Sequence, residues 1–499
     1  MKRFLCIAIT LGLLLPASAQ AQMQRSEKRG MCDNGEFYSE HAIAELAPGV
    51  TWTYNWAPTP GRQPANLGGA GCDVNFSPMC WNGYWNDGML TQYLNNNPGV
   101  RYLLGFNEPN FSSQAKMTPA EAAEKWPQLE AYAEQYNLRL VSPALNFTGE
   151  RVGGQVLQPA EWFDAFIAEY NSQHGTDPRM DYLALHCYMD YPGAVDWYVN
   201  QYLYVDNNNS SHPNLKRYFE EHGQTQLLLT EFCSWENNNG NLNADFQVQS
   251  MVEKLQVLEL SEHVAGYCWF MAHGNNNYGY PYYRIFESNN DDSPLTRLGT
   301  IYVYSSAFDS NCYFAAGQRV QAKDYMHMSG GKIDLNTDPD SEAKIEFSAF
   351  NASDGNPASA RYQVELTDNG VYTLSLRLKL LQGQQAAFSI KSDDNLVAET
   401  TLIAATSGWQ THTIQLELPA GRHMLQFTNS SNNVCGFNWF QLDQENASSA
   451  PGIKSEAQPA SVDYINLQGQ RTAEPQTGVG IVVTNMSDGT RQVSKRINK

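Results

Sequence analysis

The sequence has few basic side chains for its length. Its 499 residues include 32 Lys and Arg against 52 Asp and Glu, which gives a formal net charge of −20 at pH 7. Proteins that bind nucleic acids rely on Lys and Arg, which displace counterions from the phosphates. The charge balance therefore argues against a nucleic-acid partner and against a polyanionic substrate.

Long hydrophobic runs are also scarce. The main one lies near the N-terminus, where Lys2 and Arg3 precede an apolar stretch, residues 4–15, and small residues at 17–21. This order is typical of a signal peptide, here residues 1–21, and predicts a protein that is secreted or held at the cell surface. No later stretch approaches the roughly 20 apolar residues of a membrane-spanning helix. We expect a monomer without a membrane span.

Metal-binding motifs are missing as well. The sequence contains neither HExxH nor paired CxxC, so we expect no metal and no cofactor. Of its nine cysteines, all except Cys6 follow the predicted signal peptide, and export permits disulfides. Their pairing cannot be deduced from spacing. For Cys187, Cys233 and Cys268, which fall in predicted strands, buried free thiols are an equally open alternative.

The sequence does contain two apolar segments that each end in an acid. YLLGFNEPN at 102–110 places Glu108 after a short apolar run, and LLLTE at 227–231 ends in Glu231. Such runs are typical of strands buried on both faces of a parallel sheet. Because active sites of α/β barrels are built from the carboxyl ends of their strands, the two acids are predicted to meet there.

Strand-like and helix-like stretches alternate between residues 50 and 308. This alternation predicts an α/β fold, most simply a (β/α)8 TIM-like barrel over residues 30–315. An eighth strand is expected before Val50, or between Trp81 and Tyr102, or in degenerate form. The seven predicted strands are 50–56, 74–81, 102–106, 139–144, 181–188, 226–232 and 264–271.

The pattern changes after residue 317. Short runs alternate polar and apolar residues and are separated by turn residues, which predicts an antiparallel β-sandwich over 317–445. Residues 446–461 are rich in Ser, Ala and Pro and are expected to form a linker. A short C-terminal segment, 462–499, follows.

Paired carboxyl groups are the usual machinery of glycoside hydrolysis. One protonates the leaving oxygen and the other acts as nucleophile, about 5 Å away when configuration is retained, or as base when it is inverted. Glu108 and Glu231 fit these roles, and Asn107 could hold a sugar hydroxyl beside the reacting carbon. The alternative is that each acid is a solvated residue of a strand-end turn.

The same region contains eight short segments that together have a family likeness. They are TWTYNWAP at 51–58, FSPMCW at 76–81, LLGFNEPN at 103–110, LVSPA at 140–144, DYLALHCY at 181–188, LLLTEF at 227–232, YCWF at 267–270 and PLTRLGTIY at 294–302. In this order they resemble glycoside hydrolase family 128, a group of barrel-shaped endo-β-1,3-glucanases. The resemblance implies a retaining mechanism with Glu108 as acid/base and Glu231 as nucleophile. It also implies that either His186 or Tyr188 supports the nucleophile, and the sequence does not rank the two. A β-1,4-glycanase and a non-catalytic glycan-binding surface protein are the alternatives.

Aromatic rings stack on the apolar faces of sugars, so rings at strand ends are candidate floors for the substrate. Trp269 is the first choice among them, and core packing is the alternative for each. The candidates for the polysaccharide substrate are Tyr54, Asn55, Trp56, Trp81, Trp235 and Trp269, together with Asn107, His186 and Tyr188.

The later segments resemble accessory modules. VQAKDY at 320–325, GVYTLSLRL at 370–378, GWQTHTIQLELPAGRHMLQF at 408–427 and GFNWFQL at 436–442 resemble a family 6 carbohydrate-binding module. This resemblance implies a β-sandwich with Tyr362, Trp409 and Asn438 as sugar-binding candidates. The C-terminal segment resembles a type IX secretion sorting segment.

Overall fold

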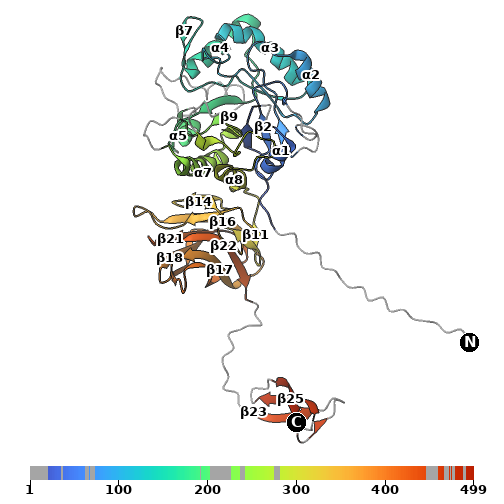
Figure 1. Cartoon of the computed structure of the whole chain (residues 1–499), viewed down its shortest axis with the longest axis vertical. Coiled ribbons are helices and arrows are strands. Elements are labelled where there is room, and N and C mark those ends of the chain that lie inside the picture. Colours follow the sequence, from blue (N-terminus) through green and yellow to red (C-terminus); the bar gives the residue numbers. More distant parts are fainter. Residues whose placement is uncertain are drawn as a thin grey trace, which may run out of the picture. The chain divides into compact units, whose positions relative to one another are not determined.

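The computed structural model describes two compact units, residues 1–443 and 444–499, apart from gaps (Figure 1). The predicted signal peptide and linker fall almost wholly outside the described residues. Those residues are 21–34, 38–61, 67, 73–191, 193–202, 226–235, 242–274, 281–445, 459–465, 471–472, 474, 478–486 and 491–498.

The first part of unit 1 is a mixed α/β region whose main strands are parallel. Six of them form one sheet in the order β3-β2-β1-β10-β9-β8, and β4 pairs with β5 in a second parallel sheet. Isolated parallel bridges join the two sheets on both sides, from Met79 to Leu104 and from Leu145 to Leu185. The strands are β1 (Arg29–Cys32), β2 (Trp52–Tyr54), β3 (Asn75–Phe76), β4 (Tyr102–Leu104), β5 (Arg139–Val141), β8 (Leu183–Cys187), β9 (Leu227–Phe232) and β10 (Val264–Phe270).

Strand β1 lies before Val50, one of the three places where a further strand was expected. It pairs in parallel with β10 on one side and β2 on the other. It begins with Arg29, whose buried guanidinium donates to Glu259 and to three backbone carbonyls. These bonds satisfy a charge that would otherwise be costly to bury.

Helices follow most of these strands, and α3 and α4 lie side by side (Figure 1). A capping box begins α3, where Thr118 and Glu121 exchange hydrogen bonds and Pro119 occupies the first turn. The helices are α1 (Glu40–Leu46), α2 (Asp87–Asn96), α3 (Pro119–Gln135), α4 (Pro159–His174), α5 (Gly193–Asp196), the π-helix η1 (Trp197–Tyr202), α7 (Ala244–Leu260), the 3-10 helix η3 (Pro281–Tyr283) and α8 (Arg297–Tyr304). A two-stranded hairpin, β6 (Arg151–Val152) and β7 (Gln155–Val156), precedes α4.

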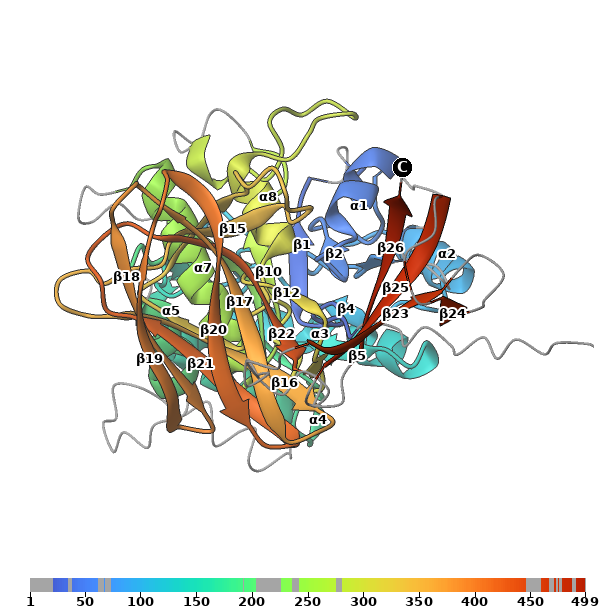
Figure 2. The same ribbon diagram turned by 90° about the horizontal axis from the view of Figure 1, so that it is seen from below.

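The second part of unit 1 consists of two largely antiparallel sheets (Figure 2). Aromatic side chains pack between them. Tyr362 and Phe427 of one sheet contact Phe437 and Phe440 of the other. The first sheet contains β11 (Phe314–Ala315), β13 (His327–Ser329), β16 (Ala358–Leu366), β18 (Gln385–Ser392), β19 (Asn395–Ile403) and β21 (Gly421–Asn429). The second contains β12 (Arg319–Gln321), β14 (Lys332–Leu335), β15 (Ile345–Ala349), β17 (Gly370–Leu380), β20 (Gly408–Leu418) and β22 (Gly436–Gln444).

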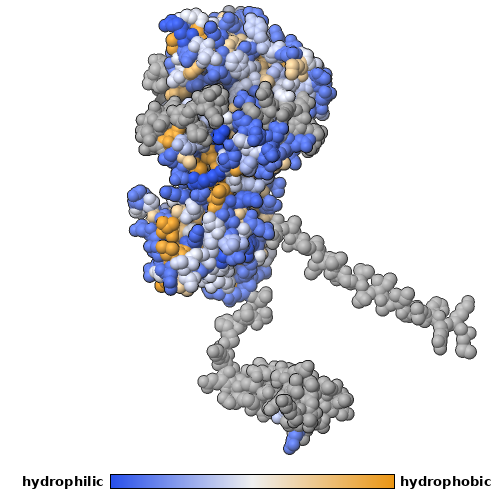
Figure 3. Space-filling model, in the orientation of Figure 1, coloured by the Kyte–Doolittle hydropathy of each residue, from blue (hydrophilic) through white to orange (hydrophobic). Residues whose placement is uncertain are grey.

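Unit 2 is a four-stranded antiparallel sheet in the order β24-β23-β25-β26. Its strands are β23 (Pro459–Ile465), β24 (Arg471–Thr472), β25 (Gly478–Met486) and β26 (Arg491–Asn498). Among the residues that the structure describes, no helix has the length and apolarity needed to cross a membrane. Hydrophilic side chains dominate the face of unit 1 drawn in Figure 3.

The seven cysteines in the described part of the chain are buried, and no disulfide joins two of them. They include Cys187, Cys233 and Cys268 of the predicted strands. Cys72 lies outside the described residues.

Candidate active site

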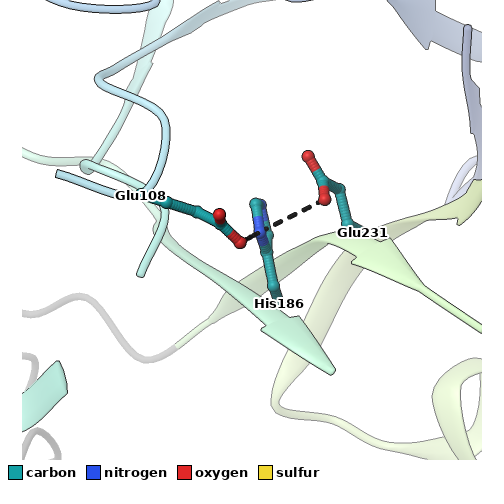
Figure 4. Close-up of side chains that lie close together, drawn as sticks. All are labelled: Glu108, His186 and Glu231. Carbon is teal, nitrogen blue, oxygen red and sulfur yellow. Dashed lines mark hydrogen bonds and ion pairs between the residues drawn. The ribbon is translucent and has the colours of Figure 1, made fainter. Parts of the chain in front are cut away.

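Glu108 and Glu231 lie at the carboxyl ends of β4 and β9 and point toward one another (Figure 4). Glu108 is fixed through its backbone, because its N–H donates to Ala144 O at 2.7 Å and the preceding Asn107 forms a parallel bridge with Ala144. Its φ of 44° lies in the left-handed region, which non-glycine residues rarely adopt. The turn directs the carboxylate across the strand ends instead of along β4.

His186 lies between the two acids. Its Nδ1 is 2.7 Å from Oε1 of Glu108 and 3.3 Å from Oε2 of Glu231. The reactive atoms of these three side chains all lie within 4.8 Å of one another. Asn146 donates to the same oxygen of Glu108 at 2.7 Å. The two carboxylates are therefore close enough to act on opposite sides of one anomeric carbon.

Glu231 accepts hydrogen bonds from three aromatic residues. The indole of Trp56 donates to Oε1 at 2.8 Å, the hydroxyl of Tyr54 donates to the same oxygen at 3.2 Å, and the hydroxyl of Tyr188 donates to Oε2. Donors of this kind stabilise an ionised carboxylate. The three bonds fix the orientation of the Glu231 carboxylate.

Burial and charge shift the pKa values at this site in opposing directions. Burial raises the pKa of Glu231 above its usual value, and the charge of Glu108 adds to this, while His186 and the hydrogen bonds from Tyr188 and Trp56 act to lower it. Burial alone would lower the pKa of His186, but the charges of Glu231 and Glu108 hold it above the usual value.

The same three groups are the cluster of His, Cys, Asp and Glu in the described part of the chain that could hold a metal ion. The surrounding donors do not fit this use, because the O–H and N–H groups of Tyr54, Trp56, Tyr188 and Asn146 all point at carboxylate oxygens that a cation would need. Hydrogen-bond donors placed in this way are suited to hold two carboxyl groups that give and take protons.

A cleft of about 610 Å³ opens above the acids. Phe270 lies at the centre of its aromatic wall and contacts Trp56, Tyr188 and Trp235 at 5.4–5.9 Å between ring centroids. Around Glu108 the wall is polar. The lining residues are Asn34, Asn55, Trp56, Trp81, Asn107, Glu108, Phe111, Ser113, Gln114, Asn146, Thr148, Glu150, Tyr188, Glu231, Trp235, Phe270 and Met271.

Several candidates from the sequence therefore lie in the cleft, but two have other roles. Trp269 is a wrong choice: it is fully buried, donates to Tyr283 O and packs on Phe232 and Tyr302. Its neighbour Phe270 lines the cleft, because successive side chains of a strand point to opposite faces. Tyr54 is also fully buried and reaches the site only through its hydroxyl on Glu231.

A buried polar stripe on α7 supports the aromatic wall. Gln247 exchanges two hydrogen bonds with the backbone of Ser234, and Lys254 donates to Ser234 Oγ and to Met189 O. These contacts fix the segments on which Trp235 and Tyr188 lie. The backbone of Trp235 in turn donates to Tyr188 O at 3.1 Å.

The three sugar-binding candidates of the antiparallel region do not form a surface site. Tyr362 is fully buried in the core and donates to Ala322 O, so it cannot contact a sugar. Asn438 is 1% exposed and donates to Asn336 and Glu346. Trp409 alone among them is partly exposed.

Residues 34–302, more than half of the chain, match the family model described as glycosyl hydrolase catalytic core. The chain belongs to this family. The matched residues include Glu108 and Glu231, which both line the cleft. A comparison with curated proteins gives no match.

Solved structures similar to this glycoside hydrolase include two enzymes of family 128, subgroup II. An endo-β-1,3-glucanase from Pseudomonas viridiflava is 34% identical, over 56% of this chain and 98% of that chain, with a TM-score of 0.44. One from Sorangium cellulosum is 30% identical, over 55% of this chain and 97% of that chain, with a TM-score of 0.41.

Replacing Tyr188 with Phe is expected to move the acidic limb of the kcat/KM profile to higher pH. The hydrogen bond from the Tyr188 hydroxyl lowers the pKa of Glu231, so its removal raises that pKa. Profiles of wild type and Tyr188→Phe measure the shift. Tyr170→Phe is the control, since Tyr170 donates to Glu130 at a different place in the fold. An unchanged acidic limb in Tyr188→Phe would contradict this role.

Proposed function

We propose that this glycoside hydrolase is a retaining endo-β-1,3-glucanase of family 128. The observation that carries the proposal is the separation of the two acids, whose oxygens lie within 4.8 Å of each other. Retaining glycosidases hold their carboxyl groups about 5 Å apart, whereas inverting enzymes need a wider gap for a water molecule. The β-1,3 linkage is proposed because the enzyme from Pseudomonas viridiflava is 34% identical over 98% of its length.

The proposed fold of the catalytic region is a (β/α)8 barrel. Six strands pair in parallel in the order β3-β2-β1-β10-β9-β8. A bridge from Leu185 of β8 leads to Leu145, just after β5, and a bridge from Leu104 of β4 leads to Met79, just after β3. These connections support a closed barrel. In such a barrel the carboxyl ends of all strands share one rim. Acids that are 123 positions apart in sequence, at 108 and 231, then meet without any special loop.

The reaction proceeds in two displacements. Glu231 attacks the anomeric carbon while Glu108 gives its proton to the leaving oxygen, which produces a covalent glycosyl ester and a free glucan end. Glu108, now ionised, takes a proton from water, and the water oxygen displaces Glu231. The buried Oδ1 of Asn107 has no hydrogen-bond partner among the residues that the structure describes, so it is suited to accept a bond from a hydroxyl of the sugar beside the reacting carbon.

We further propose that the protein is exported by its N-terminal signal peptide and acts at or outside the cell surface. The antiparallel region is proposed to be an accessory module. A sugar-binding role for it would rest on Trp409, whose indole donates to Thr337 at 3.3 Å. The C-terminal segment is proposed to serve sorting.

The test is hydrolysis of laminarin, curdlan, cellulose and mannan by the purified protein, with NMR of the first reducing ends formed. We expect cleavage of the two β-1,3-glucans, an early fall in viscosity and initial release of the β-anomer. Initial release of the α-anomer would overturn retention. Cleavage of a β-1,4 polymer alone would overturn the substrate, and binding without cleavage would favour a glycan-binding protein.

A further inference from the structure

The charged residues in the described lining of the cleft are all acids. Three carboxylates, Glu108, Glu150 and Glu231, are among its described lining residues, and no Lys or Arg is. Two of these acids carry the proposed reaction. The third, Glu150, has no part in it, so its presence calls for another explanation.

Glu150 belongs to the loop that supports the acid/base. Asn146, in the same loop, donates to Glu108, and Asn110 donates to Thr148 O at 2.9 Å. The backbone N–H of Glu150 donates to Asn110 O at 2.9 Å. The carboxylate of Glu150 is thus held by the chain that immediately follows Glu108.

The charge of Glu150 is not neutralised by its partners. Its Oε2 accepts from the N–H and the hydroxyl of Ser112, at 2.9 and 2.5 Å, and both donors are neutral. No ion pair in the described part of the chain involves Glu150. A carboxylate that is fixed in place and lines the cleft acts on any charge that the substrate carries.

The position of Glu150 indicates which part of the substrate it faces. An acid/base protonates the oxygen of the leaving group, so the polar wall around Glu108 lies beside the leaving side of the chain. The aromatic wall of Trp56, Tyr188, Trp235 and Phe270 surrounds Glu231 and the sugar that it attacks.

We propose that Glu150 determines specificity by rejecting glucans that carry anionic substituents on the leaving side of the scissile bond. This inference rests on the proposed function and refines its substrate class to uncharged β-1,3-glucan. A single charge near the cleft changes the relative rate for an anionic substrate by about three- to tenfold at low salt. Salt suppresses the effect, because the Debye length falls from about 30 Å at 0.01 M to about 3 Å at 1 M.

The experiment compares kcat/KM for carboxymethyl-curdlan and for laminarin, which share a β-1,3 backbone. It uses wild type, Glu150→Gln and Glu169→Gln. Glutamine keeps an oxygen acceptor for Ser112 and removes only the charge. Glu169 is exposed on α4, outside the cleft, so its variant carries the same change in net charge.

At about 0.01 M salt we expect the ratio of carboxymethyl-curdlan to laminarin to be roughly three- to tenfold higher in Glu150→Gln than in wild type. Glu169→Gln should match wild type. At about 1 M salt the three ratios should converge. Equal ratios for wild type and Glu150→Gln at low salt, with laminarin cleaved, would overturn the inference alone. If wild type does not cleave laminarin, the proposed function falls, and this inference falls with it.

Discussion

Replacing Glu231 with Gln is expected to lower kcat on laminarin by roughly four orders of magnitude or more, because the amide cannot attack the anomeric carbon. The side chain keeps its size, and its oxygen still accepts from Trp56 or Tyr188. Reducing-sugar release measures the loss. Thermal unfolding checks that the fold is intact, and Glu169→Gln, which changes an exposed residue of α4, is the matched control.

A variant with a smaller side chain at position 231 tests directly whether Glu231 is the nucleophile. In Glu231→Ala, added azide should attack the anomeric carbon from the face that the carboxylate has left. The product from an activated β-glucoside oligomer is then an α-glycosyl azide. A Glu231→Gln protein with more than about one tenth of wild-type kcat would contradict the assignment, because loss of a nucleophile costs far more than this.

Removing Glu108 should have a different signature. The loss on laminarin is expected to be about 10²- to 10⁴-fold, the usual contribution of general acid catalysis. With a 2,4-dinitrophenyl glycoside the first step needs no proton, so the glycosyl ester forms rapidly and accumulates. Glu108→Gly is the suitable variant, since glycine adopts the observed φ of 44° without strain.

The product formed with azide also tests the role of Glu108. It occupies the space left by Glu108, attacks the ester and gives a β-glycosyl azide. An α-azide from Glu108→Gly, or equal losses on laminarin and on the dinitrophenyl substrate, would show that the roles of the two acids are exchanged. Unfolding curves of Glu108→Gly and wild type exclude a general loss of structure.

The positions of both acids at strand ends could be predicted from the sequence, because each acid follows a buried apolar run. The amide of Asn107 and the apolar residues before it define where β4 ends. The short β1 gave no such signal, since its four residues, RGMC, include a charged side chain that is buried only through contacts with residues 259–306. A strand of this kind is specified by tertiary structure.

The direction in which a side chain points was the second feature that could not be predicted from the sequence. In YCWF every residue is apolar, so periodicity cannot show whether Trp269 or Phe270 faces the cleft. Asn146 and Glu150 lie in a polar loop, LNFTGE, that looks like any surface loop. Their roles arise from the contacts of that loop with Glu108 and Ser112, which join segments 38 residues apart.

The left-handed backbone at the active site bears on how the enzyme would fail. Glu108 and Trp56, with φ of 44° and 59°, are both held in a conformation that costs roughly 1–3 kcal/mol per residue and persists only under tight surrounding packing. Glu108 is the proposed acid/base, and Trp56 donates to Glu231, the proposed nucleophile. When heat or denaturant loosens that packing, we expect these two turns to relax before the helices and sheets unfold. Activity should then be lost at a lower temperature or denaturant concentration than ellipticity.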